Sequence, residues 1–416
     1  MMPRRNRVVV TGMGILAPNG IGLKEFWKSL LEGRSGIGPI TLFDASELES
    51  RIAGEVKDFD PSEYIEPEQK PKRMARHTQL AYVAAMMAIR DAGLEISGPD
   101  FPSPTPVVVG VSTSALDIIE RVYRDSDEHG LKGVAPTALS ASKPQAAANV
   151  IADRIGRFAH ASTVSSACPS GLDAVANAAN MIWLGEAEIA IAGGADAPLT
   201  KHSIASFIAS GLSSTRNSEP EKASRPFDLT RDSGVISEGA GMFVLEDLER
   251  AQARGASIHL EIIGYGTQRD SAPDLPGSGL VESMRLAMAD AGITTDSIDY
   301  ICAYGPGHPV LDSAEVDAIK KVFGPRAYTI PVSSVKGVTG NPLAAGGPFQ
   351  IAACGLMMQH GRIAPTANYV VPDPLCDLDF VPNRSRKSSI NCALVNVRGL
   401  GGSASTLVVS RPPRDV

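Results

Sequence analysis

The chain has 416 residues, of which 43% are hydrophobic and 20% charged, and its formal net charge is −7. This composition is ordinary for a globular protein, and the length allows two domains or one large duplicated fold. The acidic balance and the lack of a long basic run argue against a nucleic-acid-binding protein, and no window approaches the roughly 18 uninterrupted apolar residues of a membrane span.

The cysteines and histidines exclude two further classes of protein. Five cysteines, at positions 168, 302, 354, 376 and 392, show no paired spacing and no C-x-x-C motif. A disulfide framework and a structural zinc site are therefore not expected, and a reducing cytoplasm is the predicted location. The seven histidines show no metal-ligand spacing either, so no metal is predicted.

The N-terminus, MMPRRNRVVVTGMGILAP, has the basic start and apolar run of a secretory signal. Its β-branched valines and interrupting glycines instead predict a buried strand over residues 7–11 that turns at Gly12-Met13-Gly14. The glycine pair also raises a dinucleotide-binding alternative. That alternative lacks the third glycine, and the next predicted helix, over residues 23–31, begins too late to cradle a pyrophosphate.

A local basic cluster precedes the next predicted helix, which covers about residues 78–92. The cluster consists of Lys70, Lys72, Arg73 and Arg76. Two interpretations stay open: a solvated helix start, or a docking site for an acidic partner.

The remainder of the first half alternates predicted strands and helices. Residues 106–111 form a strand, residues 116–159 are helical with interruptions, and residues 189–192 form a strand that ends in GGAD. Residues 213–238 are polar and loop-like, and residues 241–246 form a strand.

The stretch ASTVSSACPSGLDA, residues 161–174, predicts a strand that turns sharply into a helix from Leu172 to about Trp183. Proline suits a first helical turn, so Cys168 is expected at the helix N-cap. There the helix dipole favours a thiolate, and a backbone N–H can hold an oxyanion. The alternative is a small buried cysteine in a tight corner.

The second half repeats this plan. A strand over residues 260–264 ends in Gly-Tyr-Gly, a helix covers 279–291, a strand covers 300–303, and a glycine-rich turn precedes a last strand at 404–409. Lys336 follows Cys168 by 168 positions, the offset that also separates the two Val-Ser-Ser stretches at 164–166 and 332–334. Two βα halves with facing corners are predicted, with Glu315 or Asp312 as the acid that pairs with Lys336.

Ordered motifs give a more specific indication. They are RVVVTGMG, VSSACPSGLDA, ASRPFDLTRD…EGAG, YGPGHPVLDSAE, VSSVKGVTGN, PTANYVVPDP and GLGG. On these motifs the chain resembles the β-ketoacyl-acyl-carrier-protein synthases, the ketosynthases of the thiolase fold, from Val8 to about Arg411. The resemblance implies an α/β fold with layers in the order αβαβα. It implies a half at residues 1–256 that carries Cys168 and a half at 257–416 that carries the other catalytic residues.

The resemblance also implies a reaction. An acyl group passes from the phosphopantetheine of an acyl-carrier protein to Cys168, so the enzyme needs no cofactor of its own. The enolate of a decarboxylated malonyl-carrier then attacks this thioester. Two histidines normally hold the enolate oxygen, a lysine–glutamate pair supports them, and backbone N–H groups of Cys168 and near Leu400 form the oxyanion hole.

This chain departs from the family where the chemistry takes place. Tyr304 and Asn341 replace the two histidines of the HGTST and TGH motifs, whereas Lys336 and Glu315 are retained. Asparagine can donate a hydrogen bond, but tyrosine is not a base at neutral pH. Losing one aimed oxyanion donor costs about 2.7–4 kcal/mol of barrier.

The substrate-binding positions differ as well. Pro306 and His308 replace the pantetheine-binding threonines, Leu400 replaces the gating phenylalanine of GFGG, and Arg398 replaces a second phenylalanine. His308 is either a substitute for a lost histidine or a plain loop residue.

Three hypotheses follow from these departures. The first is an acyltransferase that uses Cys168, with condensation altered or lost. The second is a non-catalytic partner subunit similar to the chain-length factors, although those relatives usually lose the cysteine as well. The third is an ordinary elongating synthase. The resemblance further implies a homodimer or heterodimer formed through the strand at 160–165, and it makes the basic cluster a candidate carrier-protein dock.

Overall fold

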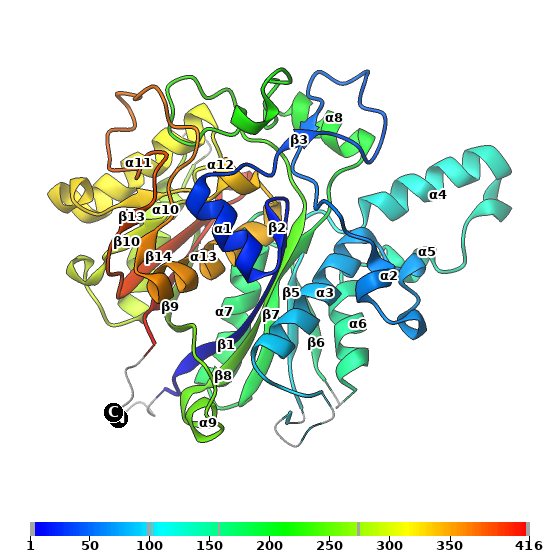
Figure 1. Cartoon of the computed structure of the whole chain (residues 1–416), viewed down its shortest axis with the longest axis horizontal. Coiled ribbons are helices and arrows are strands. Elements are labelled where there is room, and N and C mark those ends of the chain that lie inside the picture. Colours follow the sequence, from blue (N-terminus) through cyan, green and yellow to red (C-terminus); the bar gives the residue numbers. More distant parts are fainter. Residues whose placement is uncertain are drawn as a thin grey trace.

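The computed structural model describes residues 5–96, 98, 101–102, 104–156, 159–272 and 275–412 (Figure 1). Within these residues eleven strands form one sheet, with ten in a continuous path and β2 (Gly20–Ile21) paired to β1. The path runs through β11 (Val332–Ser333), β10 (Tyr300–Cys302), β14 (Cys392–Arg398), β15 (Ser403–Ser410), β9 (Leu260–Arg269), β1 (Val8–Ala17), β8 (Gly239–Asp247), β7 (Ile189–Asp196), β5 (Val107–Gly110) and β6 (Ala161–Val164).

The sheet consists of two five-stranded halves with the same strand order. Numbered by their sequence within each half, the strands run 1-5-4-2-3 outward from the centre, as β1-β8-β7-β5-β6 and as β9-β15-β14-β10-β11. The halves join where Val8 and Val10 pair antiparallel with Ile262 and Leu260. This repeat confirms the predicted duplication, while the division into units 1–256 and 257–416 stays a prediction.

The helices of the described residues cover both faces of the two half-sheets. They are α1 (Leu23–Glu32), α2 (Pro61–Tyr64), α3 (Arg76–Asp91), α4 (Leu116–His129), α5 (Ala138–Ala141), α6 (Ala146–Ile155), α7 (Ser170–Trp183), α8 (Lys201–Ala209), α9 (Leu248–Ala253), α10 (Ser278–Asp290), α11 (Pro309–Phe323), α12 (Lys336–Thr339) and α13 (Gly346–His360). Short 3-10 turns include η7 (Leu343–Ala345) and η8 (Leu400–Gly402), and the pairs β3 (Gly38–Pro39) with β4 (Ile52–Ala53) and β12 (Arg362–Ile363) with β13 (Arg386–Lys387) form two small separate sheets.

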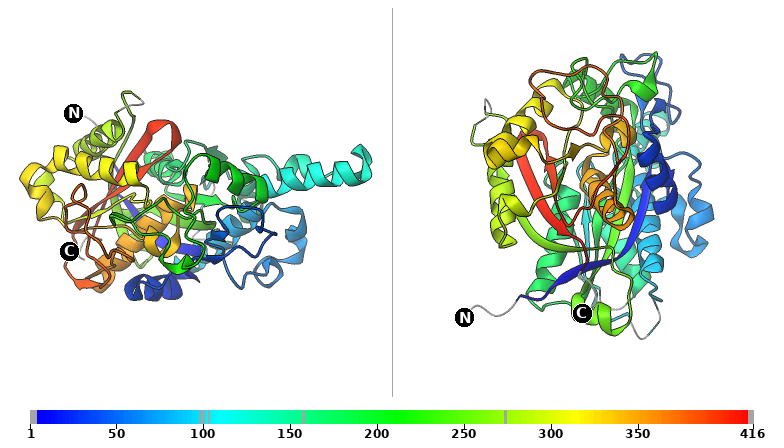
Figure 2. Two further views of the ribbon diagram at one scale, coloured as in Figure 1. Left: turned by 90° about the horizontal axis from the view of Figure 1, so that it is seen from above. Right: turned by 60° about the vertical axis from the view of Figure 1, so that its left-hand side comes forward.

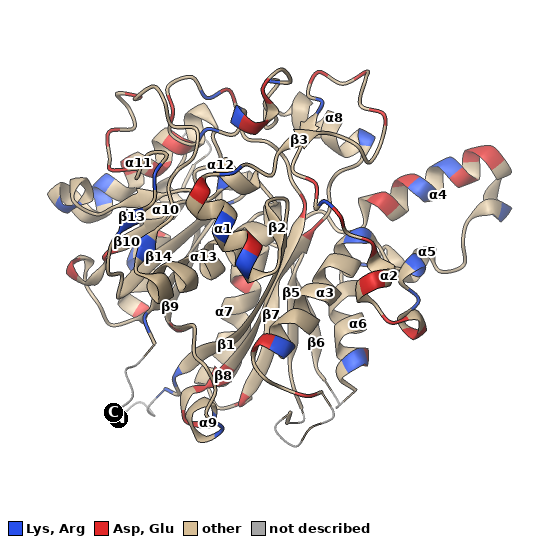
Figure 3. Ribbon diagram, in the orientation of Figure 1, with Lys and Arg blue, Asp and Glu red and all other residues tan. Residues whose placement is uncertain are grey.

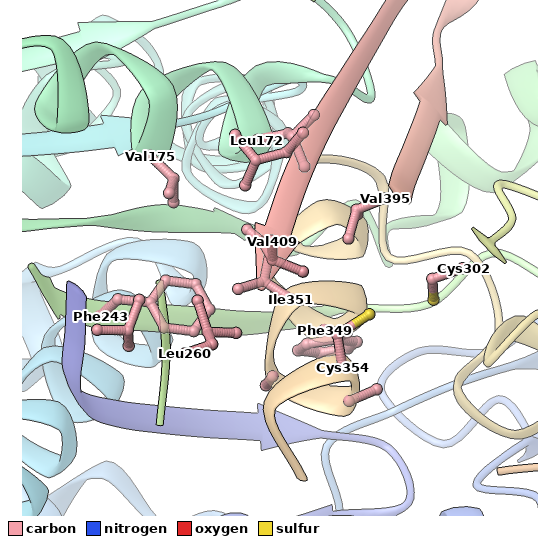
Figure 4. Close-up of a cluster of buried hydrophobic side chains, with 14 of the residues drawn as sticks. Leu172, Val175, Phe243, Leu260, Cys302, Phe349, Ile351, Cys354, Val395 and Val409 are labelled. Carbon is pink, nitrogen blue, oxygen red and sulfur yellow. The ribbon is translucent and has the colours of Figure 1, made fainter. Parts of the chain in front are cut away.

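Helices α7 and α13 form the middle layer, where they pack against each other and against strands of both halves. Nearly every residue of α13 is buried, as expected for a helix that is apolar on all sides. Figure 4 shows Leu172 of α7 and Ile351 of α13 meeting Val409 between the half-sheets. Helices α3 and α10 cover the outer faces of β1 and β9, which completes the order αβαβα (Figure 2).

The predicted turns at the glycine pairs are wrong, because the strands continue through them. Strand β1 runs on to Ala17, β9 to Arg269, and β7 through its glycines to Asp196. A Cβ on Gly14 would lie 2.0 Å from the carbonyl oxygen of Ala84, and one on Gly266 would lie 2.3 Å from that of Ser283. The glycines therefore let α3 and α10 sit directly on the strands.

One part of the first half departs from the compact body. The segment predicted as interrupted helix resolves into α4, α5 and α6, although residues 157–158 within it lie outside the described residues. Figure 2 shows α4 projecting sideways from the sheet layers. Charges of both signs alternate along α4, whereas the central strands carry few (Figure 3). Across the described ranges, no helix combines the length and apolarity that crossing a membrane requires.

Candidate active site

The Cys168 corner is a strained strand-to-helix turn. After β6, Ala167 adopts a left-handed backbone with φ of 65°, a conformation that residues with a Cβ rarely adopt. Cys168 follows with 5% of its surface exposed, and α7 begins at Ser170. Pro169, one residue later than predicted, is the helix-capping residue. Cys168 therefore lies between the end of β6 and the start of α7, where it lines a cavity.

Hydrogen bonds from both halves hold this corner. The Ser166 hydroxyl donates to Asp173, and the Tyr265 hydroxyl of β9 donates to the other oxygen of that carboxyl at 2.9 Å. The Ser403 hydroxyl of β15 donates to the Ser166 carbonyl at 3.0 Å. Burial raises the pKa of Asp173. The nucleophile is thus positioned by two strands that lie more than 90 residues away in sequence.

Tyr304 lies directly against Cys168. Its hydroxyl donates to Cys168 Sγ over 3.7 Å. Burial raises the pKa of the Cys168 thiol, while the Tyr304 hydrogen bond and the Lys336 charge oppose that rise. The sequence predicted a thiolate, but burial has the largest effect on this pKa and favours the neutral thiol. Burial also raises the pKa of Tyr304 well above its ordinary value, so Tyr304 remains a donor.

Lys336 and Glu315 lie behind Tyr304. The Lys336 Nζ sits 4.6 Å from the centre of the Tyr304 ring, and burial lowers the pKa of Lys336 to about 8. Glu315 accepts hydrogen bonds from the backbone N–H groups of Tyr304 at 2.9 Å and Gly305 at 2.8 Å. It therefore fixes the backbone that carries Tyr304.

Asp312, the other predicted acid, has a different place. It accepts hydrogen bonds from the Phe227 and Gly307 N–H groups, at 2.8 and 3.1 Å, and faces the Arg231 guanidinium at 3.6 Å. The sequence left open which of the two acids pairs with Lys336, and among the described residues neither forms an ion pair with it. The Lys336 Nζ instead donates to Gln350 at 3.4 Å, and both carboxylates act on its pKa only through their charge.

A cavity of about 150 Å³ opens beside Cys168. The structure brings seven predicted site residues to its wall: Cys168, Tyr304, Pro306, His308, Asn341, Arg398 and Leu400. Sequence reasoning missed its apolar lining, which includes Phe207, Leu212, Ile236 and Leu343. These residues carry no local motif, since loops and helices distant in sequence bring them together.

His308 is fixed in the cavity wall by a capping role. Its Nδ1 accepts hydrogen bonds from the N–H groups of Val310 at 3.1 Å and Leu311 at 3.3 Å at the start of α11. Because Nδ1 is an acceptor, the ring proton of neutral His308 is on Nε2. Burial and the nearby Arg231 and Arg398 charges lower the pKa of His308, which keeps the ring neutral.

Asn341 lines the same cavity wall as Tyr304. A hydrogen bond from its side chain lowers the pKa of Tyr304, against the larger effect of burial. Its Oδ1 is buried without a hydrogen-bond partner in the described part of the chain. Tyr304 and Asn341, which the sequence analysis expects to replace two histidines, thus line the same cavity as Cys168.

The glycine-rich turn of residues 399–402 closes the cavity over the nucleophile. A Cβ on Gly399 would lie 2.9 Å from the Ala167 Cβ and 2.8 Å from the Pro169 Cδ, so the turn lies against the Cys168 corner. Leu400 at its tip is 60% exposed. Arg398, just before the turn, forms an ion pair with Asp270 at 2.5 Å.

A groove of about 1330 Å³ lies next to this cavity, between α4, α8 and the loop at residues 42–44. Phe207, Leu212 and Leu400 line both the groove and the cavity. These three side chains form the boundary between a small chamber at Cys168 and a much larger space.

The four residues of the basic cluster do not all face solvent. Lys70, Lys72 and Arg73 are exposed on two short 3-10 turns before α3. Arg76 instead turns inward, where it forms two hydrogen bonds of 2.6 Å to the fully buried carboxyl of Glu238. Three of the four residues therefore present a cationic surface.

Comparisons with known proteins place the chain in a family. Residues 5–251 match the family described as Beta-ketoacyl synthase, N-terminal domain, and residues 259–370 match Beta-ketoacyl synthase, C-terminal domain. The ketoacyl synthase alpha subunit of the tetracenomycin polyketide synthase of Streptomyces glaucescens is 38% identical over 419 residues, covering 98% of this chain and 97% of that relative. The 3-oxoacyl-[acyl-carrier-protein] synthase 2 of Coxiella burnetii is 38% identical over 411 residues, with 98% and 99% coverage.

Solved structures agree with this placement. The ishigamide ketosynthase/chain length factor has a TM-score of 0.91 at 34% identity, covering 98% of this chain and 100% of that one. A type II PKS ketosynthase bound to the hexaketide, in complex with its acyl-carrier protein, has a TM-score of 0.89 at 32% identity, with 98% and 99% coverage. The predicted thiolase-like ketosynthase fold is confirmed.

Proposed function

The chain belongs to the beta-ketoacyl synthase family, and from this membership we propose a specific activity for it. It is a ketosynthase-like acyltransferase of fatty-acid or type II polyketide biosynthesis that takes an acyl group from acyl-carrier protein onto Cys168, with decarboxylative condensation altered or lost. The observation that carries the proposal is the contact of 3.7 Å between the Tyr304 hydroxyl and Cys168 Sγ. It joins an intact nucleophile to a residue that replaces a catalytic histidine.

Acylation needs only groups that the chain retains. The Cys168 sulfur attacks the carbonyl carbon of the acyl thioester, a new C–S bond forms, and the bond to the pantetheine sulfur breaks. The pantetheine leaves as a thiol with the proton that Cys168 gives up. The N–H groups of Cys168 and Leu400 are the proposed oxyanion donors, which the packing of Gly399 against Ala167 and Pro169 supports. The phosphopantetheine arrives on the carrier.

Condensation needs two donors aimed at the malonyl thioester carbonyl, and here their replacements face each other. The Tyr304 hydroxyl donates to Cys168, and the Asn341 side chain is near enough to act on the pKa of the same hydroxyl. Each lost oxyanion donor costs about 2.7–4 kcal/mol of barrier, or about 100- to 1000-fold in rate. Decarboxylation is therefore the step that this site is expected to lose.

His308 is the proposed substitute donor in the cavity. Its Nδ1 is held by the start of α11, so its Nε2–H is the group left to meet a carbonyl oxygen in the cavity. A neutral imidazole donates a single hydrogen bond in this arrangement. We assign this hydrogen bond to the carbonyl oxygen of the acyl or malonyl thioester. One donor stabilises charge on that oxygen less well than two donors would.

The carrier protein is proposed to dock on Lys70, Lys72 and Arg73. Carrier proteins are acidic, and these exposed cations offer a complementary surface. A known relative supports the partner, since a type II PKS ketosynthase of similar fold forms a complex with its acyl-carrier protein. Arg76 is left out of this surface because Glu238 holds it.

A second candidate function is that of a non-catalytic subunit similar to a chain length factor, which pairs with a complete ketosynthase. The observation that favours pairing is the outer edge of β6, which ends the sheet path and has no strand partner among the described residues. Such an edge is a template for another strand. The similar ishigamide structure contains a ketosynthase and a chain length factor.

Intact-protein mass spectrometry distinguishes the two functions. The full chain is incubated with an acyl-carrier protein, with Cys168→Ala as the matched control. The proposed function predicts one acyl group on the native chain and none on the variant. Absence of an adduct on both would refute it and favour the subunit role, which co-purification of a chain with the complete histidine pair would then establish.

A further inference from the structure

The cavity beside Cys168 has one charged side chain. Of the described residues in its wall, Arg398 alone carries a fixed charge, and none is an aspartate or glutamate. Arginine stays protonated at any physiological pH. An anionic group inside the cavity would therefore meet a cation and no carboxylate.

The partner of Arg398 lies outside the cavity wall. Its Nε and Nη2 both donate to Oδ2 of Asp270, at 3.2 and 2.5 Å. The other oxygen of Asp270 accepts from the Gly279 N–H at 2.8 Å, at the first turn of α10, so the carboxyl is fixed from behind. Within the described part of the chain, Arg398 Nη1 has no hydrogen-bond partner.

The position of Arg398 places this cation within electrostatic range of the reacting groups. It ends β14, directly before the turn that carries Leu400. Its charge adds to the burial that lowers the pKa of His308 and opposes the burial that raises the pKa of Tyr304. Both residues line the same cavity. The guanidinium thus lies beside the space that an acyl group on Cys168 would occupy.

We propose that this cavity takes an acyl thioester whose short acyl chain carries a carboxylate, and that Arg398 Nη1 binds that carboxylate. The proposal rests on the acyltransferase function of Cys168 and names its substrate class. A volume of about 150 Å³ equals that of about five water molecules, which fits a half-thioester of a short dicarboxylic acid. A charge-assisted hydrogen bond in a partly buried site is among the stronger polar contacts.

The chemical step is the transthioesterification already described, with the carboxylate as a spectator. Cys168 forms the new thioester bond, and the pantetheine sulfur leaves as a thiol. The carboxylate takes no part in this step and stays on the acyl chain. Arg398 is thus a specificity-determining residue, while Asp270 positions it.

Two synthetic N-acetylcysteamine thioesters test the proposal on the full chain. One carries a succinyl group and the other a 4-oxopentanoyl group, in which a methyl replaces the carboxylate oxygen. The ratio of their rates of Cys168 acylation is measured by intact mass. The expected ratio favours succinyl by about tenfold or more in the native chain, as one hydrogen bond to a charged group allows.

Variants separate recognition from a structural role. Arg398→Met is expected to bring the ratio to about one, and Arg398→Lys to retain part of the preference. Asp270→Asn breaks the ion pair but keeps the cation, so the preference should persist.

A native ratio near one would overturn this inference alone. If the Arg398 and Asp270 variants are acylated more slowly, and to the same extent, by both thioesters, the inference is also overturned. Arg398 would then only hold the turn at residues 399–402 in place. Acylation by neither donor would refute the proposed function and the inference together.

Discussion

Replacing Tyr304 by phenylalanine removes the hydroxyl that donates to the nucleophile. The ring stays, and so does its contact with Lys336 Nζ at 4.6 Å. What is lost is the hydrogen bond that the hydroxyl donates to Cys168 Sγ over 3.7 Å. That bond lowers the pKa of Cys168 against the larger effect of burial, so the pKa of the thiol must rise in the variant.

The size of the rise follows from the geometry. Hydrogen bonds to charged groups contribute about 1.5–3 kcal/mol, and a sulfur acceptor at this separation belongs at the weak end of that range. About 1.4 kcal/mol corresponds to one pKa unit. Tyr304→Phe should therefore raise the pKa of Cys168 and lower the rate of its alkylation at neutral pH about tenfold.

The rate of Cys168 alkylation by iodoacetamide, followed by peptide mass spectrometry across neutral to alkaline pH, measures this shift. Tyr82→Phe is the matched control, because the Tyr82 hydroxyl donates to Glu66 and not to Cys168. The control should keep the native midpoint. If the Tyr304→Phe midpoint stays in place or falls, Tyr304 does not stabilise the thiolate and the account of this site is wrong.

Three further predictions concern packing, burial and docking. Gly14→Ala should destabilise the fold by about 1–3 kcal/mol in urea unfolding, because the new Cβ would meet the Ala84 carbonyl at 2.0 Å; an unchanged midpoint would contradict the close helix–strand contact. Burial lowers the pKa of His77 from 6.5 to about 4. As the pH falls through this interval, the unfolded state binds a proton at His77 before the folded state does. The free energy of unfolding should therefore fall by up to about 3 kcal/mol. The His77→Gln variant should lose this dependence of the free energy of unfolding on pH, while the His202→Gln variant should keep it. The same pH dependence in both variants would refute the prediction. Arg73→Glu should weaken the binding of the carrier protein in titration calorimetry, most strongly at low salt. An affinity equal to that of the native chain would show that the carrier protein docks on another surface.

Much of the fold was predictable because it is encoded in local patterns that repeat. Runs of β-branched residues predicted the strands of both halves. The spacing between Cys168 and Lys336, which equals the spacing between the two Val-Ser-Ser stretches, predicted the duplication. The glycine pairs were predicted as turns, but they lie within strands. A glycine that lets a helix pack closely on a strand cannot be distinguished by sequence alone from a glycine that forms a turn. Only the approach of α3 to β1 distinguishes them.

The candidate site was predictable in its members but not in its electrostatics. Cys168, Tyr304 and Asn341 were found from motifs, but the direction of the Cys168 pKa shift depends on burial by distant segments. The Arg398–Asp270 pair joins residues 128 positions apart, and no local pattern announces it. The capping role of His308 does have a signal in the sequence, since the following Pro309 is typical of a first helical position.

The central claim is that Cys168 accepts an acyl group while its altered neighbours fail to drive condensation. The most direct test adds malonyl-acyl-carrier protein to the chain already acylated on Cys168, and follows both the adduct and released CO₂ in a single turnover. The account predicts that the adduct persists and that CO₂ release is at least about 100-fold slower than in a relative with both histidines. Discharge of the adduct at the rate of that relative, with an equivalent of CO₂, would contradict it.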